Sequence, residues 1–588
     1  MPAAASPSPD PPLAEGDVPQ AGALSVDRNI AVRLAEAAAQ RPDERAVLVP
    51  PDAKGRGGGS KTFAELDEEA NAVARGLLDL GAGPESRLVM AVRPGLDFLS
   101  IAFGLFRSRA TAVLIDPGMG RKNVVACLAE ANVDGVVGIP LAQAMRRLKR
   151  AAFPNATVNV CVGRGLPGFG VAYERLLAAG RKSQTPIAAT RATDAAAIIF
   201  TSGSTGPPKG VCYEHGMFDA QWQLIRDEYD IEPGTCDVAC FPLFGLFNVA
   251  MGVTTIWPRI DFANPATADS ETLADAFAAA AQSDEGEPRP VQSFASPAIW
   301  KTLADDATGK RVLPPTLTQA LSAGAPVPPR TLAAIRKTMP GDGRFHTPYG
   351  ATESLPACTI ESREVLQETA AATAGGQGTC VGRPFRGVDV RVIRRPTRTV
   401  ADILETEEAS VGEIGEILVR SPAVTREYFN RPEATAATKI ADGDRWWHRI
   451  GDVGYFDEQG RLWFCGRISH IVPTPEGPLY PVCLEPLFNA DPFVERTALV
   501  GFEHLDRRVT PVLVCELARG SRFRIGDREN VARQVLRTAG GHADARRIRH
   551  VVVQTQPLPV DARHNAKIRR EQIAAELDWK HVLEVNLV

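Results

Sequence analysis

Amphipathic helices and short apolar strands alternate along the first part of this chain, and this alternation limits the folds that the chain can adopt. Apolar residues recur at helical spacing over residues 63–80, and residues 87–92 then have the composition of a buried strand. A second helical pattern ends near Arg107, just before an apolar strand at residues 112–115. Parallel strands need long crossover connections, which helices usually supply, so the sequence predicts an α/β fold with a parallel sheet covered by helices.

Three segments of the chain differ in character. Residues 1–26 are rich in Ala, Pro and Ser and lack the basic and apolar regions of a signal peptide, so we expect a disordered tail. Residues 27–466 carry the alternating pattern and form the expected large domain. A proline-rich stretch at residues 472–481 marks a change of composition, and we place a small C-terminal domain at residues 467–588.

Composition excludes several classes of protein. The chain has 66 Lys and Arg against 70 Asp and Glu, a balance that argues against a nucleic-acid-binding protein. Its ten cysteines form no C-x-x-C pair and are typical of reduced thiols in a cytoplasmic protein. The one uncharged run long enough to consider as a membrane span, residues 238–257, contains Pro242, Gly245 and Gly252 and predicts buried core instead of a transmembrane segment. A peripheral contact with a membrane stays open.

A loop of hydroxyls and glycines directly follows the apolar residues 198–200. Glycines let the backbone approach an anion, and hydroxyls and amides donate to phosphate oxygens. The pattern therefore predicts a phosphate-binding loop, because its order is too particular for a plain flexible turn. The loop consists of Thr201, Ser202, Gly203, Ser204, Thr205 and Gly206, followed by two prolines and the positively charged Lys209.

Residues 163–168 match the pattern G-x-G-x-x-G between a predicted strand and a predicted helix. Pro167 removes one amide from this loop, although a dinucleotide-binding loop works by offering its amides to a pyrophosphate. We therefore interpret residues 163–168 as an ordinary strand-to-helix connection.

Several further segments, in this order, resemble the motifs of the adenylate-forming superfamily, which comprises acyl-CoA synthetases, adenylation domains and luciferases. The resemblance runs from Asp27 to the C-terminus and implies a large α/β domain, a small α+β lid domain, and ATP with Mg²⁺ bound between them. One departure is Ile450, which stands where Thr is usual. The similar segments are the loop at 198–211, residues 322–326, 349–353, 415–417 with Tyr428, 448–452, 466–467 and 565–568.

The resemblance also implies roles for single residues around the nucleotide. Tyr349 is expected to stack on adenine, and Asp452 and Arg467 are expected to hold the ribose. Glu353 is a hard oxygen ligand of the kind that Mg²⁺ prefers. The other residues implied to contact the nucleotide are Gly324, Ala325, Pro326, Gly350, Thr352 and the phosphate loop from Thr201 to Lys209.

Three residues are implied to act in catalysis. Thr352 is expected to donate to the α-phosphate, and Lys209 to add positive charge at the phosphate loop. Lys567 is expected to come from the small domain and to neutralise charge on the α-phosphate and on the reacting carboxylate. The reaction implied is attack of a carboxylate on the α-phosphorus of ATP, which gives an acyl-adenylate and pyrophosphate.

The chain departs from acyl-CoA synthetases at two places. Ser469 stands at the hinge, where Asp or Lys is usual, and prolines crowd residues 473–478, so a channel for pantetheine is not expected. Gly245 stands where His is frequent. With residues 348–356 and 563–568, these features resemble the olefin-pathway β-lactone synthetases, in which the hydroxyl of a long-chain β-hydroxy acid attacks its own adenylate. That resemblance also implies association with a thiolase-like condensing enzyme, a reductase and a β-lactone decarboxylase.

Alternatives stay open at this stage. The chain could be a long-chain fatty acyl-CoA synthetase or fatty acyl-AMP ligase, or a non-catalytic binding protein on the same fold. The group that takes the hydroxyl proton is not identified: His346 either lies near the adenylate or is structural, and His215 is expected to pack. Three phenylalanines, Phe241, Phe244 and Phe247, are expected to combine core packing with an apolar acyl pocket.

Overall fold

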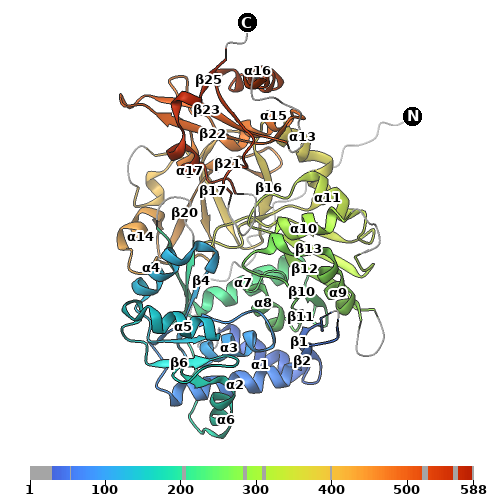
Figure 1. The fold of residues 1–588 in the computed structure, drawn as a ribbon, viewed down its shortest axis with the longest axis vertical. Helices are drawn as coiled ribbons and strands as arrows, with labels where there is room; N and C mark the ends of the chain where they lie inside the picture. The colour runs from blue at the N-terminus through green and yellow to red at the C-terminus, as the bar shows by residue number, and fades with distance from the viewer. Residues whose placement is uncertain are drawn as a thin grey trace, which may run out of the picture.

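The computed structural model of the chain contains three seven-stranded sheets and one four-stranded sheet in the part that it describes (Figure 1). The predicted tail, residues 1–26, lies outside the described residues. The described residues are 29–52, 54–201, 207–282, 288–306, 313–396, 400–518, 527–560 and 567–585.

The first sheet has the strand order β7-β6-β5-β3-β4-β8-β9 and is parallel except for its last pair. This confirms the predicted alternation of strands and helices. Its strands are β3 (Arg87–Ala91), β4 (Thr111–Ile115), β5 (Gly135–Gly138), β6 (Val158–Cys161), β7 (Val171–Ala172), β8 (Ala195–Thr201) and β9 (Lys209–Glu214), and its helices are α2 (Phe63–Asp79), α3 (Leu96–Arg107), α4 (Arg121–Ala131), α5 (Pro140–Leu148) and α6 (Tyr173–Lys182).

Helix α2 begins where its sequence provides a capping box. The hydroxyl of Thr62 accepts from the backbone amide of Glu65, and the carboxylate of Glu65 accepts from the amide of Thr62. Each bond satisfies an amide that the first turn of a helix would leave without a partner. The predicted start of the helix at Phe63 is therefore set by local chemistry.

The second sheet has the order β14-β13-β12-β10-β11-β1-β2 and is parallel apart from β2. Its carboxyl edge carries the loops that lead to the candidate site. Its strands are β1 (Arg45–Val49), β2 (Gly59–Thr62), β10 (Cys236–Val238), β11 (Thr254–Ile256), β12 (Val291–Ala295), β13 (Leu317–Ser322) and β14 (Arg344–His346), and the helices around it are α1 (Ile30–Gln40), α7 (His215–Tyr229), α8 (Phe244–Ala250), α9 (Ser270–Ala281), α10 (Pro297–Ala304) and α11 (Pro329–Arg336).

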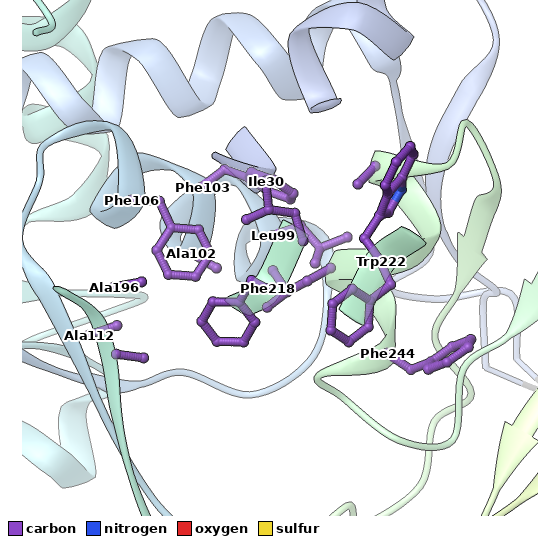
Figure 2. Packing of buried hydrophobic residues seen from close by; sticks show 14 of the residues in the cluster. Ile30, Leu99, Ala102, Phe103, Phe106, Ala112, Ala196, Phe218, Trp222 and Phe244 are labelled. Atoms are coloured by element: carbon purple, nitrogen blue, oxygen red, sulfur yellow. The ribbon is translucent and has the colours of Figure 1, made fainter. Parts of the chain in front are cut away.

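The main core lies where helices α1, α3, α7 and α8 meet strands β4 and β8. Helix α3 is buried on almost all sides, which explains its nearly uniform apolar sequence. Every residue of α8 is buried, and the rest of residues 238–257 is buried except for the half-buried positions 241–243, so this run is core, as predicted. No helix in the described part of the chain is both long and apolar enough to cross a membrane. Figure 2 shows part of this core, formed by Ile30, Leu99, Ala102, Phe103, Phe106, Ala112, Ala196, Phe218, Trp222 and Phe244.

The third sheet is antiparallel, whereas the alternation of helices and strands in the sequence predicted only a parallel sheet. Its strand order is β15-β16-β21-β20-β18-β17, with β19 paired to β20. The strands are β15 (Cys358–Thr359), β16 (Thr379–Pro384), β17 (Asp389–Ile393), β18 (Gly415–Arg420), β19 (Lys439–Asp442), β20 (Arg445–Phe456) and β21 (Leu462–Arg467), with helices α12 (Ser362–Glu364), α13 (Ala370–Ala374) and α14 (Pro432–Thr438).

The smaller C-terminal unit follows β21 and contains its own four-stranded sheet (Figure 1). Helices pack on this sheet around a separate apolar core. The mixed α/β architecture with a small α+β unit therefore agrees with the predicted fold class. Its elements are α15 (Pro481–Asn489), β22 (Val494–Glu503), β23 (Val509–Leu517), α16 (Arg528–Thr538), β24 (His550–Gln554), α17 (Arg570–Glu576) and β25 (Leu583–Glu584).

A buried carboxyl group lies in the second sheet. Asp237 on β10 is fully buried, and its Oδ2 accepts from Nε2 of Gln292 at 3.0 Å. Burial raises the pKa of Asp237 to about 7, although hydrogen bonds from Gln292 and Asn248 oppose the shift. The folded protein therefore holds this carboxyl partly neutral near physiological pH.

We expect the substitution Asp237→Asn to raise the midpoint of thermal unfolding at pH 8. Because the pKa is higher in the folded state than in the unfolded chain, the contribution of Asp237 to stability is fully present below about pH 4 and is lost as the pH rises to about 7, by up to about 4 kcal/mol. Asparagine keeps an oxygen that can accept from Gln292 and carries no charge. The rise in the unfolding midpoint caused by Asp237→Asn should therefore shrink as the pH falls from 8 towards 4. A gain of equal size at pH 8 and pH 5 would contradict this account.

Candidate active site

The predicted phosphate loop connects two antiparallel strands. Thr201, at the end of β8, is the register partner of Lys209, at the start of β9. Residues Ser202 to Gly206 lie outside the described residues. Nζ of Lys209 lies 5.0 Å from the centre of the Tyr428 ring, close enough for a cation–π contact. We call the hairpin of β8 and β9, which carries the predicted phosphate loop, the phosphate hairpin. It is in contact with the segment around Tyr428.

Tyr428 also contacts Glu353, the predicted metal ligand. Its hydroxyl donates to Oε1 of Glu353 at 2.7 Å. The backbone of the same glutamate is held by Thr425, whose amide donates to the Glu353 carbonyl at 2.9 Å. Among the described residues, no donor contacts the other carboxylate oxygen. Tyr428 thus contacts both the phosphate hairpin and Glu353. The resemblance had included Tyr428 in a similar segment but had implied no role for it.

Lys439 on β19 lies outside all the segments that the sequence indicated. It donates to the carbonyl of Thr425, and its Nζ lies 3.0 Å from Nδ1 of His448. Burial lowers the pKa of Lys439 to about 7, while the charge of Glu353 acts in the opposite direction. Burial and the neighbouring lysine lower the pKa of His448 well below its usual value. Lys439 therefore supports the loop that holds the backbone of Glu353.

The predicted adenine and ribose residues lie together. The hydroxyl of Tyr349 donates to Oδ2 of Asp452 at 2.7 Å. Asp452 on β20 and Arg467 on β21 are register partners, and Nε of Arg467 lies 3.3 Å from Oδ1 of Asp452. Burial raises the pKa of Asp452, and the charge of Arg467 and the bond from Tyr349 oppose this shift. The structure thus brings three residues that are far apart in sequence to one place.

The remaining nucleotide-side residues follow neighbouring strands. Gly324, Ala325 and Pro326 form the loop after β13, and Tyr349 and Gly350 follow β14, its parallel neighbour. The carboxyl ends of parallel strands meet at one edge of a sheet, which is where ligands bind in α/β folds. Gly324 has φ +97°, a conformation that favours glycine. The carbonyl of Thr352 accepts from the hydroxyl of Tyr213.

Lys567 of the small unit lies near this cluster. Its positive charge is among the groups that oppose the rise in the pKa of Asp452, so the ammonium group lies within electrostatic range of that carboxyl group. The ring of His470, in the hinge, lies 2.8 Å from Oε1 of Glu571 in α17, the helix that follows Lys567. The side chain of Lys567 is exposed. The small unit therefore presents its candidate catalytic lysine to the ribose side of the site.

His346, whose role the sequence left open, and His215, which was expected to pack, both lie against aromatic rings. The ring of His346 lies 5.0 Å from that of Tyr229, and the ring of His215 lies 5.6 Å from that of Phe106. Burial lowers the pKa of each histidine to about 4. His215 therefore packs as predicted, and the contacts of His346 are those of a core side chain.

The departure at Gly245 has a steric cause. A Cβ at this position would lie 2.6 Å from Cη2 of Trp257, which is shorter than any normal contact. Trp257 cannot move aside, because it is buried between Phe98 and Phe262 with ring centres 5.7 and 5.8 Å away. The indole thus occupies the space that a side chain at residue 245 would need. Nearby, the ring of Phe294 contacts those of Phe241 and Phe244.

The proline-rich loop after the hinge is closed at its base. Val472 and Leu479 exchange two backbone hydrogen bonds, and the hydroxyl of Thr474 donates to the carbonyl of Gly477 at 2.7 Å. Arg547 of the small unit donates to Thr474 and to Gly477 and forms an ion pair with Glu476. The loop is therefore a fixed hairpin of the small unit.

The donor set suits Mg²⁺ better than a transition metal. No three His, Cys, Asp or Glu side chains gather as a ligand cluster among the residues that the structure describes. Mg²⁺ is commonly held by one or two carboxylates together with substrate phosphates and water. A single carboxylate, Glu353, beside the phosphate hairpin fits that form of binding.

Comparison with known proteins identifies the family. The model of the AMP-binding enzyme family matches residues 34–429. Two proteins named olefin β-lactone synthetase, from Stenotrophomonas maltophilia (strain K279a) and Xanthomonas campestris pv. campestris, are 44% and 42% identical to this chain, over 93% and 94% of it and 97% and 98% of their own lengths.

Solved structures share the fold at lower identity. The amide bond synthetase McbA from Marinactinospora thermotolerans has a TM-score of 0.73 and 21% identity, over 93% of this chain and 98% of its own. The o-succinylbenzoate coenzyme A synthetase of Bacillus subtilis, in complex with AMP, has a TM-score of 0.69 and 18% identity, over 92% of this chain and 97% of its own. The chain therefore belongs to the AMP-binding enzyme family, as a homologue of olefin β-lactone synthetases.

Proposed function

We propose that this enzyme uses ATP to convert a long-chain β-hydroxy carboxylic acid into a β-lactone, AMP and pyrophosphate. The observation that carries the proposal is the identity of 42–44%, over nearly the whole chain, to two olefin β-lactone synthetases. The cluster of Tyr349, Asp452 and Arg467 supports it, because a nucleotide needs an aromatic face and acceptors for its ribose.

The reaction has two steps. In the first, the carboxylate of the acid attacks the α-phosphorus of ATP and pyrophosphate leaves, so that an acyl-adenylate forms. Lys567, Lys209 and the hydroxyl of Thr352 stabilise negative charge on the phosphates as this step proceeds. In the second step, the β-hydroxyl oxygen attacks the carbonyl carbon, AMP leaves and the hydroxyl gives up its proton. The attack is intramolecular, so no second substrate has to be bound and oriented.

Glu353 and the ATP phosphates would hold Mg²⁺, which neutralises phosphate charge when it is bound. Tyr428 orients the carboxylate of Glu353 through its hydrogen bond, and Thr425 and Lys439 hold the backbone on which that carboxylate is carried. The same tyrosine contacts Lys209, so the metal ligand and the phosphate hairpin are kept in one arrangement.

Two features favour the acid's own hydroxyl over coenzyme A as the acceptor. The loop at residues 473–478 is closed by internal bonds and by Arg547, so it cannot open for a pantetheine arm without breaking them. Trp257 fills the space beside Gly245, where related acyl-CoA synthetases frequently carry a histidine.

We expect a β-hydroxy acid with ATP and Mg²⁺ to give AMP, pyrophosphate and a neutral product that is one water lighter than the acid. Added coenzyme A should change neither the rate nor the product. The matched acid without the β-hydroxyl should stop at the bound adenylate, because it offers a leaving group but no internal nucleophile. Mass spectrometry of the products and titration of free thiol measure these outcomes. If the deoxy acid instead turns over rapidly with coenzyme A and consumes thiol, the proposed function is wrong and the enzyme is an acyl-CoA ligase.

Release of pyrophosphate in the same experiment would exclude the alternative of a non-catalytic binding protein on this fold. The division into a large domain at residues 27–466 and a lid at residues 467–588, a cytoplasmic location, and association with a thiolase-like condensing enzyme, a reductase and a β-lactone decarboxylase belong to the same proposal. The hinge segment Ile468–His470 directly follows β21, which supports the division at Arg467.

A further inference from the structure

Positive charge is concentrated in one segment of the chain. Residues 135–173 contain five Lys and Arg and no Asp or Glu, although the whole chain has a net charge of -4. The segment includes α5 and the connection at residues 163–168 that matches a glycine-rich motif. Figure 1 shows α5 at the periphery of the large domain, next to α4 and β6. The five cations are Arg146, Arg147, Lys149, Arg150 and Arg164.

These cations are not neutralised by neighbours. None of them takes part in an ion pair within the described part of the chain. Burial, followed by repulsion from Arg147 and Arg150, lowers the pKa of Arg146. Four of the five cationic residues are exposed, so their charge is available to attract an anionic partner of the protein.

Large apolar side chains are exposed beside the cations. Leu141 and Leu148 lie seven positions apart on α5, which places them on one face of the helix, and they are 71% and 82% exposed. Leu166, in the connection that follows β6, is 68% exposed. Arg147 donates to the carbonyl of Pro167 at 3.0 Å, so this connection is held against α5. We call these three leucines and the five cations the α5 surface.

We propose that the α5 surface docks on an anionic phospholipid bilayer. A basic amphipathic helix with exposed leucines can insert the leucines among the acyl chains while its arginines and lysines contact the headgroups. Each cation near such a surface strengthens binding about fivefold. Nucleic acid would use the cations alone and leave the leucines in water, so the combination favours a bilayer. The inference concerns attachment and is independent of the reaction proposed above.

Sedimentation of the full chain with vesicles tests the proposal. The chain should bind vesicles of phosphatidylglycerol and phosphatidylcholine in about equal parts, should not bind phosphatidylcholine alone, and should be released by salt. Leu141→Ser with Leu148→Ser should weaken binding by roughly tenfold or more, because it removes the inserted apolar groups and keeps every charge. Lys149→Glu with Arg150→Glu should abolish binding.

Leu404→Ser is the matched control. Leu404 is 91% exposed but lies among acidic residues, Asp402, Glu405 and Glu407, so its loss should leave vesicle binding unchanged. Formation of AMP from a dissolved β-hydroxy acid should be the same in all of these variants, so failure of the docking proposal and failure of the reaction proposal are distinguishable. No binding to anionic vesicles would overturn the proposal. The proposal would also be overturned if the leucine variant bound vesicles as well as the wild type and RNA competed with the vesicles. The α5 surface would then be a site for polyanions.

Discussion

Replacing Lys567 by alanine is expected to lower the rate of adenylate formation by roughly a hundred- to a thousandfold while ATP still binds. The side chain lies close enough to Asp452 to affect its pKa, but it belongs to the small unit, and its charge is needed mainly when negative charge develops on the α-phosphate. Loss of one preorganised electrostatic contact of this kind costs about 3–4 kcal/mol in the transition state. Pyrophosphate release measures the rate, and equilibrium binding of ATP measures the ground state.

Lys580→Ala is the control for this experiment. Lys580 is also an exposed lysine of the small unit, and it pairs with Asp578 at the surface. Its removal should leave the rate unchanged, since an exposed ion pair contributes little. Near-normal pyrophosphate release by a folded Lys567→Ala enzyme would remove Lys567 from the catalytic residues.

The second large effect is expected at Glu353. Glu353→Gln should raise the Mg²⁺ concentration needed for half-maximal activity by roughly ten- to a hundredfold, because an ionic ligand is replaced by a neutral one. Glutamine keeps an oxygen that can accept from Tyr428, so the surrounding bonds and the fold should persist. The measurement is the dependence of pyrophosphate release on Mg²⁺ at saturating ATP and acid.

Glu458→Gln serves as the matched variant, because Glu458 is an exposed glutamate in a surface turn. It should show the wild-type dependence on Mg²⁺. If Glu353→Gln also shows the wild-type dependence on Mg²⁺, the assignment of Glu353 as the metal ligand is wrong. The phosphate oxygens of ATP must then hold the ion without this carboxylate.

The parts of this molecule that could be predicted from the sequence are those with a local cause. Helix α2 follows from its apolar spacing and from the capping residues Thr62 and Glu65. That Tyr349 and Asp452 serve one site is what the resemblance to adenylate-forming enzymes implies. The contact of Tyr428 with Glu353 could not be found in this way, because the two residues are far apart in sequence, and Lys439 belongs to none of the similar segments. A single hydroxyl or ammonium group has no local pattern that would indicate such a contact.

The antiparallel third sheet escaped prediction for a related reason. Strand β18 pairs with β20 across the long segment between Arg420 and Arg445, so the apolar periodicity of each strand does not reveal the direction of its neighbour. Strands β20 and β21, which also pair, are joined by a short turn. By contrast, the lack of space for a Cβ at position 245 beside Trp257 explains a sequence departure that had no physical reason before the two residues were seen together.

That pair of residues also bears on how such enzymes can diverge. A side chain at position 245 collides with the indole of Trp257, whereas loss of the indole alone leaves a cavity, and truncating a buried aromatic side chain typically costs about 3–5 kcal/mol. Each substitution is harmful by itself, and only the two together restore a filled core. Positions 245 and 257 should therefore change in concert among relatives. An ancestor with histidine at position 245 must carry a residue smaller than tryptophan at position 257, so the path to Gly245 and Trp257 crosses an intermediate with an unfilled cavity.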